Sequence, residues 1–105
     1  MAKREVIELL KRYIELLRSE GISVSKAFLY GSYSDETATD QSDIDVLLVS
    51  DQFDQANDQL AGKVWRLTSK VSSKIEPFII GSNKFNRDDY SPIILKVKES
   101  GIQII

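Results

Sequence analysis

The chain has 105 residues, 42% of them hydrophobic and 29% charged, and a formal net charge of −2. This size and composition predict a single globular domain covering residues 1–105, and the negative balance argues against a broad nucleic-acid-binding surface. The sequence contains neither cysteine nor histidine, which excludes disulfides, thiolate or imidazole zinc sites and histidine-dependent catalytic triads.

Membrane insertion and secretion are not expected from the sequence. No apolar run approaches the roughly 18 residues that a membrane span needs, and the charges scattered through the N-terminal segment are unlike a signal peptide. We therefore expect a cytoplasmic protein in which any catalysis depends on carboxylates, hydroxyls, lysines, arginines or bound metal.

The first part of the chain predicts a helix, a strand and a polar loop. Residues 3–20 carry apolar side chains at helical spacing, and Gly21 is expected to end this helix. Residues 24–30 predict a strand that a glycine ends. Residues 32–42 are polar and predict a loop, with one helical turn near Tyr33. The apolar stripe of the helix consists of Val6, Ile7, Leu10, Tyr13, Ile14 and Leu17.

The middle of the chain predicts a strand, a helix and a further strand. Residues 43–49 predict a strand whose apolar end, 46–49, is buried on both faces. Residues 54–72 predict a long helix. Residues 74–80 predict a third strand, in which Pro77 favours an edge position or a bulge because it lacks an N–H group. The core stripe of the long helix consists of Ala56, Leu60, Val64, Leu67 and Val71.

The end of the chain predicts a short helix over residues 91–100. Ser91 can cap this helix, Pro92 suits its first position and Gly101 suits its end. The tail 102–105 predicts either a short strand or a loose end. The order of elements predicts an α/β fold of the α+β kind, with a small mixed sheet and helices packed against it.

Two pairs of residues predict a site for phosphate and metal. Alternate side chains of a strand share a face, so Asp43 and Asp45 are expected to point the same way. Adjacent carboxylates repel each other and Mg²⁺ prefers carboxylate and phosphate oxygens, so the pair predicts a metal platform. Gly31 and Ser32 predict a turn that holds phosphate through backbone N–H groups and a hydroxyl. Each pair also has a plainer interpretation, as a simple turn or as solvated, capping acids.

The run of Gly31-Ser32, ten residues and Asp43-Ile44-Asp45 resembles the signature of the nucleotidyltransferase fold shared with DNA polymerase beta. It is especially similar to that of the minimal nucleotidyltransferases of bacteria and archaea, and the order of elements is similar over nearly the whole chain. The resemblance implies a nucleotidyltransferase fold in which Gly31 and Ser32 bind the nucleotide and Asp43 and Asp45 bind divalent metal.

The family usually has a third acid on the next strand, and Glu76 is the candidate here. An unpaired carboxylate inside an apolar strand is costly to bury, so Glu76 should face either the metal site or solvent. The resemblance implies that Glu76 helps to bind the catalytic metal or takes the proton from the attacking hydroxyl.

The activity implied by the resemblance is transfer of a nucleoside monophosphate, AMP from ATP, to an acceptor hydroxyl with release of pyrophosphate. Two Mg²⁺ ions, or Mn²⁺, are the implied cofactors. The usual partner of minimal family members is a small helical HEPN protein, a toxin with ribonuclease activity, and some members act as its antitoxin by adding AMP to a toxin tyrosine. A homo-oligomer could also complete the acceptor site. The alternatives are a non-catalytic antitoxin and an aminoglycoside-type antibiotic nucleotidyltransferase.

Further polar and aromatic residues have two interpretations each. Lys63, Arg66 and Lys70 share one face of the predicted helix, which is either solvated or within reach of a phosphate. Trp65 either flanks the core or forms a binding surface, for a partner protein or, as the least favoured use, for a stacked nucleobase. Tyr33 either lines the predicted site or is an exposed loop residue.

Overall fold

The structure of the chain is a computed structural model that describes residues 1–55, 57–87 and 91–105. Its sheet has the strand order β3-β2-β1-β4, in which β1 is antiparallel to β2 and β4, and β2 is parallel to β3. The elements, in chain order, are α1 (Lys3–Ser19), β1 (Lys26–Tyr30), η1 (Gly31–Tyr33), β2 (Ile44–Ser50), η2 (Asp51–Phe53), α2 (Asp58–Thr68), β3 (Ile75–Gly81), α3 (Ser82–Arg87), α4 (Pro92–Ser100) and β4 (Ile102–Gln103). The predicted mixed sheet with packed helices is confirmed.

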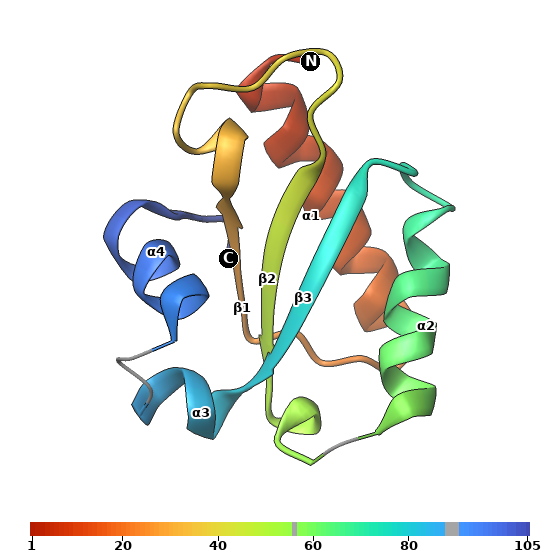
Figure 1. Ribbon diagram of the computed structural model, residues 1–105. Coiled ribbons are helices and arrows are strands. Elements are labelled where there is room, and N and C mark those ends of the chain that lie inside the picture. The colour runs from red at the N-terminus through yellow and green to blue at the C-terminus, as the bar shows by residue number, and fades with distance from the viewer. Residues whose placement is uncertain (56, 88–90) are drawn as a thin grey trace.

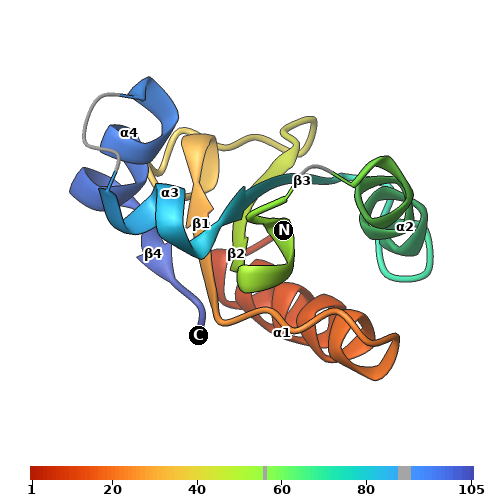
Figure 2. The same ribbon diagram turned by 90° about the horizontal axis from the view of Figure 1, so that it is seen from below.

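Helices cover both faces of the sheet. Helices α1 and α2 lie on one face, and α3 and α4 lie on the other (Figure 1, Figure 2). Strand β2 supplies both layers, because Val46 and Leu48 belong to the larger core on the α1 side while Leu47 and Val49 belong to the smaller core on the α4 side. The expected burial of this strand on both faces is therefore confirmed.

Helix α1 follows its predicted stripe closely. Five of the six predicted stripe residues are buried and Ile7 is half-buried, while Leu9 is a further buried residue. Gly21 has a φ of 86°, a left-handed conformation that ends a helix readily. Inside the core, the Tyr13 hydroxyl donates a hydrogen bond of 2.7 Å to the Val64 carbonyl and so joins α1 to α2. Within the described residues, no helix is long and apolar enough to cross a bilayer.

Helix α2 begins later than the pattern predicts. The predicted start at residue 54 is wrong, because the side chain of Asn57 accepts a hydrogen bond of 3.0 Å from the Leu60 N–H group and caps the helix there. The 3₁₀ turn η2 occupies the preceding residues 51–53. Val64 and Leu67 of the predicted stripe are buried, and Ala56 lies outside the described residues.

Helix α3 has no counterpart in the sequence prediction. Its first turn is held by Asp54, whose side chain accepts a hydrogen bond of 3.0 Å from the Asn83 N–H group. Phe85 is the buried anchor of this helix, with its ring centroid 5.4 Å from that of Phe28. The six residues of α3 therefore depend on contacts with other elements.

The remaining elements agree with prediction in place but not in every detail. Pro77 lies on β3, which pairs with β2 alone among the described strands, so the predicted edge position is confirmed. Pro92 begins α4 as expected, whereas Gly101 follows the helix in an extended conformation with φ −68°. Of the two predictions for the tail, the strand is correct: β4 pairs with β1, and the Ile104 N–H group donates to the Ala27 carbonyl at 2.7 Å.

Candidate active site

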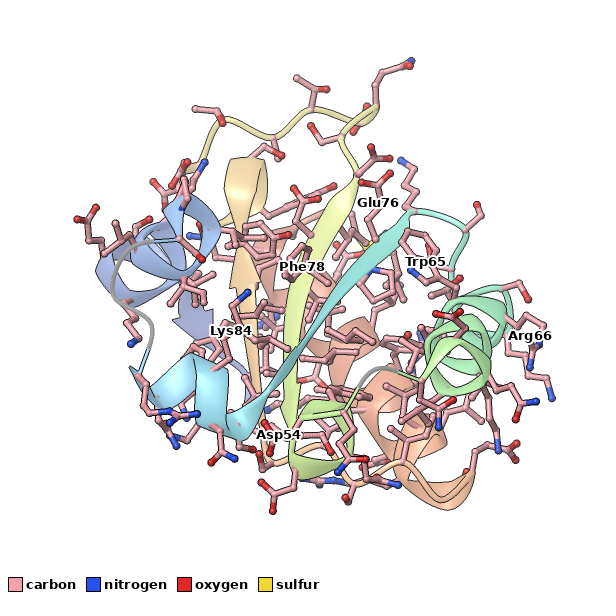
Figure 3. All side chains as sticks on the ribbon, turned by 60° about the horizontal axis from the view of Figure 1, so that its bottom comes forward. Asp54, Trp65, Arg66, Glu76, Phe78 and Lys84 are labelled. Atoms are coloured by element: carbon pink, nitrogen blue, oxygen red, sulfur yellow. The ribbon has the colours of Figure 1, made fainter. Side chains whose placement is uncertain are left out.

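Two of the predicted acids lie in one row across the sheet. Tyr30 of β1 is paired with Asp45 of β2, and Asp45 is paired in turn with Glu76 of β3. Because directly paired residues share a face, these three side chains project from the same side of the sheet. That side is the one whose lower part is covered by α3 and α4, and Glu76 lies near its open end (Figure 3).

Asp43 joins this row from just outside the sheet. It lies one residue before β2 and is exposed, so it is not a strand residue as the sequence predicts. Its side chain still shares a hydrogen bond with Glu76, and its charge acts on both Asp45 and Glu76. The structure thus brings the three predicted acids together, although within the described residues no three such side chains form a complete metal-binding cluster.

Burial and mutual repulsion both favour the neutral forms in this row. Desolvation raises the pKa of Asp45, the negative charge of Asp43 raises it further, and Lys96 opposes the shift. Desolvation also raises the pKa of Glu76, together with the charges of Asp43 and Asp45 and the hydrogen bond to Asp43. Burial, Asp45 and Glu76 raise the pKa of Tyr30 to about 12, so its phenol is neutral at physiological pH. Asp43, Asp45 and Glu76, together called the acid row, therefore repel one another when ionised, and a bound cation would reduce this repulsion.

The predicted phosphate turn is pressed against this row. Gly31 has a φ of 76°, and a Cβ atom placed on it would lie 2.4 Å from Oδ2 of Asp45. The Gly31 carbonyl accepts hydrogen bonds from the N–H groups of Ser34, at 3.1 Å, and Asp35, at 2.9 Å, which close the predicted helical turn. Ser32 is half-buried beside Gly31. The backbone thus comes directly up to a carboxylate, which a side chain at position 31 would prevent.

Two charged or polar neighbours of the site were not predicted. Tyr30 completes the row on β1, and its place could have been inferred from the pairing of β1 with β2. Lys96 of α4 makes an ion pair of 3.5 Å with Asp35, which follows η1, and its charge acts on Asp45. No pattern in the sequence points to Lys96, because only the packing of α4 brings it to the turn.

An exposed aromatic side chain, Phe78, lies on the same face of the sheet as the acid row. Phe78 is two residues beyond Glu76 on β3, so both project from one side, and Phe78 is 45% exposed (Figure 3). It lines a surface pocket of about 350 Å³ together with Asp54, Lys84 and Ile93. None of the three acids lines this pocket, which adjoins the acid row through Phe78.

The other candidate residues of the sequence lie on α2 or in the larger core. Lys63 donates a hydrogen bond of 2.9 Å to the Glu20 carbonyl and so ties α2 to the end of α1. Arg66 and Trp65 are exposed on α2, with Arg66 directed away from the sheet (Figure 3). Tyr33 is buried in the larger core, so its interpretation as an exposed loop residue is wrong.

Comparison with known proteins decides the family. The family model described as the nucleotidyltransferase domain matches residues 10–102. The chain belongs to the nucleotidyltransferase domain family. Nucleotidyltransferase domains are enzymes, so the acid row and the Gly31 turn are candidates for the catalytic site. No curated protein sequence matches the chain.

Solved structures share the fold of this nucleotidyltransferase domain. A candidate nucleotidyltransferase from Sulfolobus solfataricus has a TM-score of 0.62 at 17% identity, covering 83% of this chain and 77% of its own. A toxin–antitoxin complex with AMP-PNP has a TM-score of 0.60 at 20% identity, covering 100% of this chain and 73% of the other. A variant of the toxin–antitoxin MntA-HpeT, with two aspartates replaced by glutamates, has a TM-score of 0.57 at 19% identity, with coverage of 100% and 73%.

Proposed function

We propose that this nucleotidyltransferase domain transfers AMP from ATP to an acceptor hydroxyl and releases pyrophosphate. The observation that carries the proposal is the contact between the Gly31 turn and Asp45, because it joins a phosphate-binding backbone to the acid row. A nucleotide held by Gly31 and Ser32 would have its phosphates directly beside Asp43 and Asp45. That arrangement suits phosphoryl transfer, which depends mainly on positioning and charge stabilisation.

The acid row suits divalent metal. Its donors are carboxylate oxygens, and the raised pKa values of Asp45 and Glu76 reflect desolvation and repulsion between the carboxylates, both of which a bound cation would offset. Mg²⁺ typically binds one or two carboxylates and completes its coordination with water and substrate phosphates, so a full protein cage is not required. Asp43, Asp45 and Glu76 would hold two Mg²⁺ ions or Mn²⁺, which supply charge neutralisation for the leaving pyrophosphate and lower the pKa of the acceptor hydroxyl.

In this reaction, residues of the chain bind and orient the nucleotide, and one of them accepts a proton from the acceptor hydroxyl. Ser32 and the N–H groups of the turn orient the β- and γ-phosphates of ATP. The acceptor oxygen forms a bond to the α-phosphorus as the bond from that phosphorus to the bridging oxygen breaks, and pyrophosphate leaves with the electron pair. Glu76, which is exposed on the edge strand β3, takes the proton of the acceptor hydroxyl as general base.

The acceptor in this proposal belongs to a helical HEPN partner, and the chain acts as its antitoxin. Support comes from the shared fold with two toxin–antitoxin structures, one of them with AMP-PNP. Further support comes from Phe78, an exposed aromatic side chain on the strand and face that carry Glu76, as expected where a protein partner presents its hydroxyl.

The test is transfer of label from α-labelled ATP with Mg²⁺, in the presence and absence of the protein encoded by the neighbouring gene. We expect label on that partner, and expect Asp43→Asn with Asp45→Asn to reduce the rate roughly a hundredfold or more with the fold intact. The matched control is Glu8→Gln with Glu15→Gln, which removes two exposed acids from α1 and should transfer normally.

Each outcome separates the proposal from its alternatives. Full activity in the Asp43→Asn, Asp45→Asn variant would exclude the acid row as the metal site. A stable complex with the partner but no label would instead indicate an antitoxin that acts by binding. Label on an added aminoglycoside alone would indicate an antibiotic nucleotidyltransferase.

A further inference from the structure

Lys96 lies against the phosphate turn although it comes from a distant part of the chain. Helix α4 packs over β1, with Ile94 and Val97 buried in the smaller core and Tyr30 packed against that core. This packing brings the Lys96 side chain to Asp35, where Nζ and Oδ2 are 3.5 Å apart. The charge of Lys96 also acts on Asp45.

Asp35 connects this ion pair to the turn itself. The Asp35 N–H group donates a hydrogen bond of 2.9 Å to the Gly31 carbonyl, so the backbone of Asp35 is fixed beside the Gly31–Ser32 turn. The charged groups therefore follow the order of the sheet: Glu76 on β3, Asp45 on β2, the turn after β1, and Lys96 over β1. Asp45 and Glu76 lie toward the β3 end of the site, and Lys96, paired with Asp35, lies at the other end.

The ion pair with Asp35 is weak enough to be exchanged. The side chains of Lys96 and Asp35 are 50% and 37% exposed, and ion pairs as exposed as this one contribute little to stability. The β- and γ-phosphates of a nucleotide carry more negative charge than one carboxylate. A lysine on a flexible stem can move from the carboxylate to those phosphates without a change in the backbone.

We propose, on the basis of the proposed function, that Lys96 binds the pyrophosphate part of the nucleotide and that Asp35 holds the lysine in place until the nucleotide displaces it. The site then has a direction across the sheet: the leaving group lies toward α4 and the acceptor approaches from the β3 edge. Lys96 stays protonated throughout. Its charge stabilises the electron pair that the pyrophosphate oxygen gains when the bond to the α-phosphorus breaks.

The test compares ligands that contain or lack the pyrophosphate part. Binding of ATP, AMP and inorganic pyrophosphate to the full chain is measured by calorimetry with Mg²⁺ present. We expect Lys96→Ala to weaken ATP and pyrophosphate about tenfold or more and to leave AMP unchanged, and Lys96→Arg to restore most of the ATP affinity. Asp35→Asn should strengthen pyrophosphate binding severalfold, because it removes the competing carboxylate. Lys70→Ala, which removes an exposed lysine beyond the end of α2, is the matched control and should change none of the three.

The outcomes distinguish this inference from the proposed function. If the wild-type chain binds ATP and Lys96→Ala binds it equally well, Lys96 has no role in the pyrophosphate site, although the nucleotide site stands. Equal weakening of ATP and AMP would indicate a structural role and would also overturn the inference. If the wild-type chain binds neither ATP nor pyrophosphate with Mg²⁺, both proposals fail.

Discussion

At the scale of single residues, position 31 requires glycine for two reasons, its backbone conformation and its closeness to Asp45. Its φ of 76° is a conformation that costs other residues roughly 1–2 kcal/mol, and a Cβ atom would meet Asp45 Oδ2 at 2.4 Å. We therefore expect Gly31→Ala to lower the free energy of unfolding and to reduce nucleotidyl transfer more than tenfold, because Asp45 must move. Chemical denaturation and a transfer assay measure the two effects.

Gly21 supplies the control for this substitution. Its φ is 86°, but a Cβ atom there would have no heavy atom within 4 Å among those described. Gly21→Ala should therefore show the cost of the backbone conformation alone and keep full activity. If the two variants lose equal stability and Gly31→Ala remains active, the close approach of Gly31 to Asp45 has no functional role.

The desolvation of Asp45 and its repulsion by Asp43 predict a pH-dependent gain in stability for Asp45→Asn. The pKa of Asp45 is raised in the folded state, so the folded protein binds its proton more tightly than the unfolded chain, whose aspartate pKa is about 3.9. Ionised Asp45 thus lowers the free energy of unfolding. This loss is absent below the pKa of the unfolded chain and grows as the pH rises through the pKa of the folded state.

Urea unfolding without divalent metal, measured from acidic to neutral pH, checks this expectation. The free energy of unfolding of Asp45→Asn should equal that of the wild type at about pH 3.5 and exceed it at pH 7. In a thermal scan, each 1 kcal/mol of this gain would raise Tm by about 4–8 °C. A gain of the same size at both pH values would attribute the effect to packing, and the ionisation of Asp45 would then not be its cause.

At the scale of elements, the sequence predicts those whose stability follows from their own periodicity. Helix α1 and strand β2 bury the residues that their patterns select. The start of α2 was misplaced because polar residues around 54–57 suit a helix equally well as a turn, and the Asn57 cap decides between them. The sequence does not predict helix α3, because it is short, has the single buried residue Phe85, and depends on Asp54, which accepts a hydrogen bond from the Asn83 N–H group.

The same distinction applies to the site. Asp43, Asp45 and Gly31 could be placed together from spacing, since one loop joins the turn to the strand that carries the acids. Glu76 could be added because its strand follows and pairs with β2. Lys96 could not be predicted, because its contact with Asp35 depends on how α4 packs across β1, and no local pattern specifies that packing.

At the scale of the whole molecule, the two faces of the sheet differ. The α1 and α2 face is closed over the larger core, while the other face leaves Asp43, Glu76 and Phe78 exposed beyond α3 and α4. An enzyme whose acceptor is a side chain of another protein needs an open approach of this kind. The position of Phe78 beside Glu76 and at the rim of a pocket makes it the side chain that such a partner would contact first.

We therefore expect Phe78→Ala to raise the KM for the partner about tenfold or more, since buried aromatic contacts are often the strongest at protein interfaces. ATP affinity should not change. Trp65→Ala is the matched control, because Trp65 is 51% exposed against 45% for Phe78 but lies on α2, which packs on the opposite face of the sheet from the acid row (Figure 2). Steady-state transfer to the partner and calorimetric ATP binding measure the two effects. An unchanged KM in Phe78→Ala, or an equal rise in Trp65→Ala, would mean that the acceptor does not approach from the β3 edge.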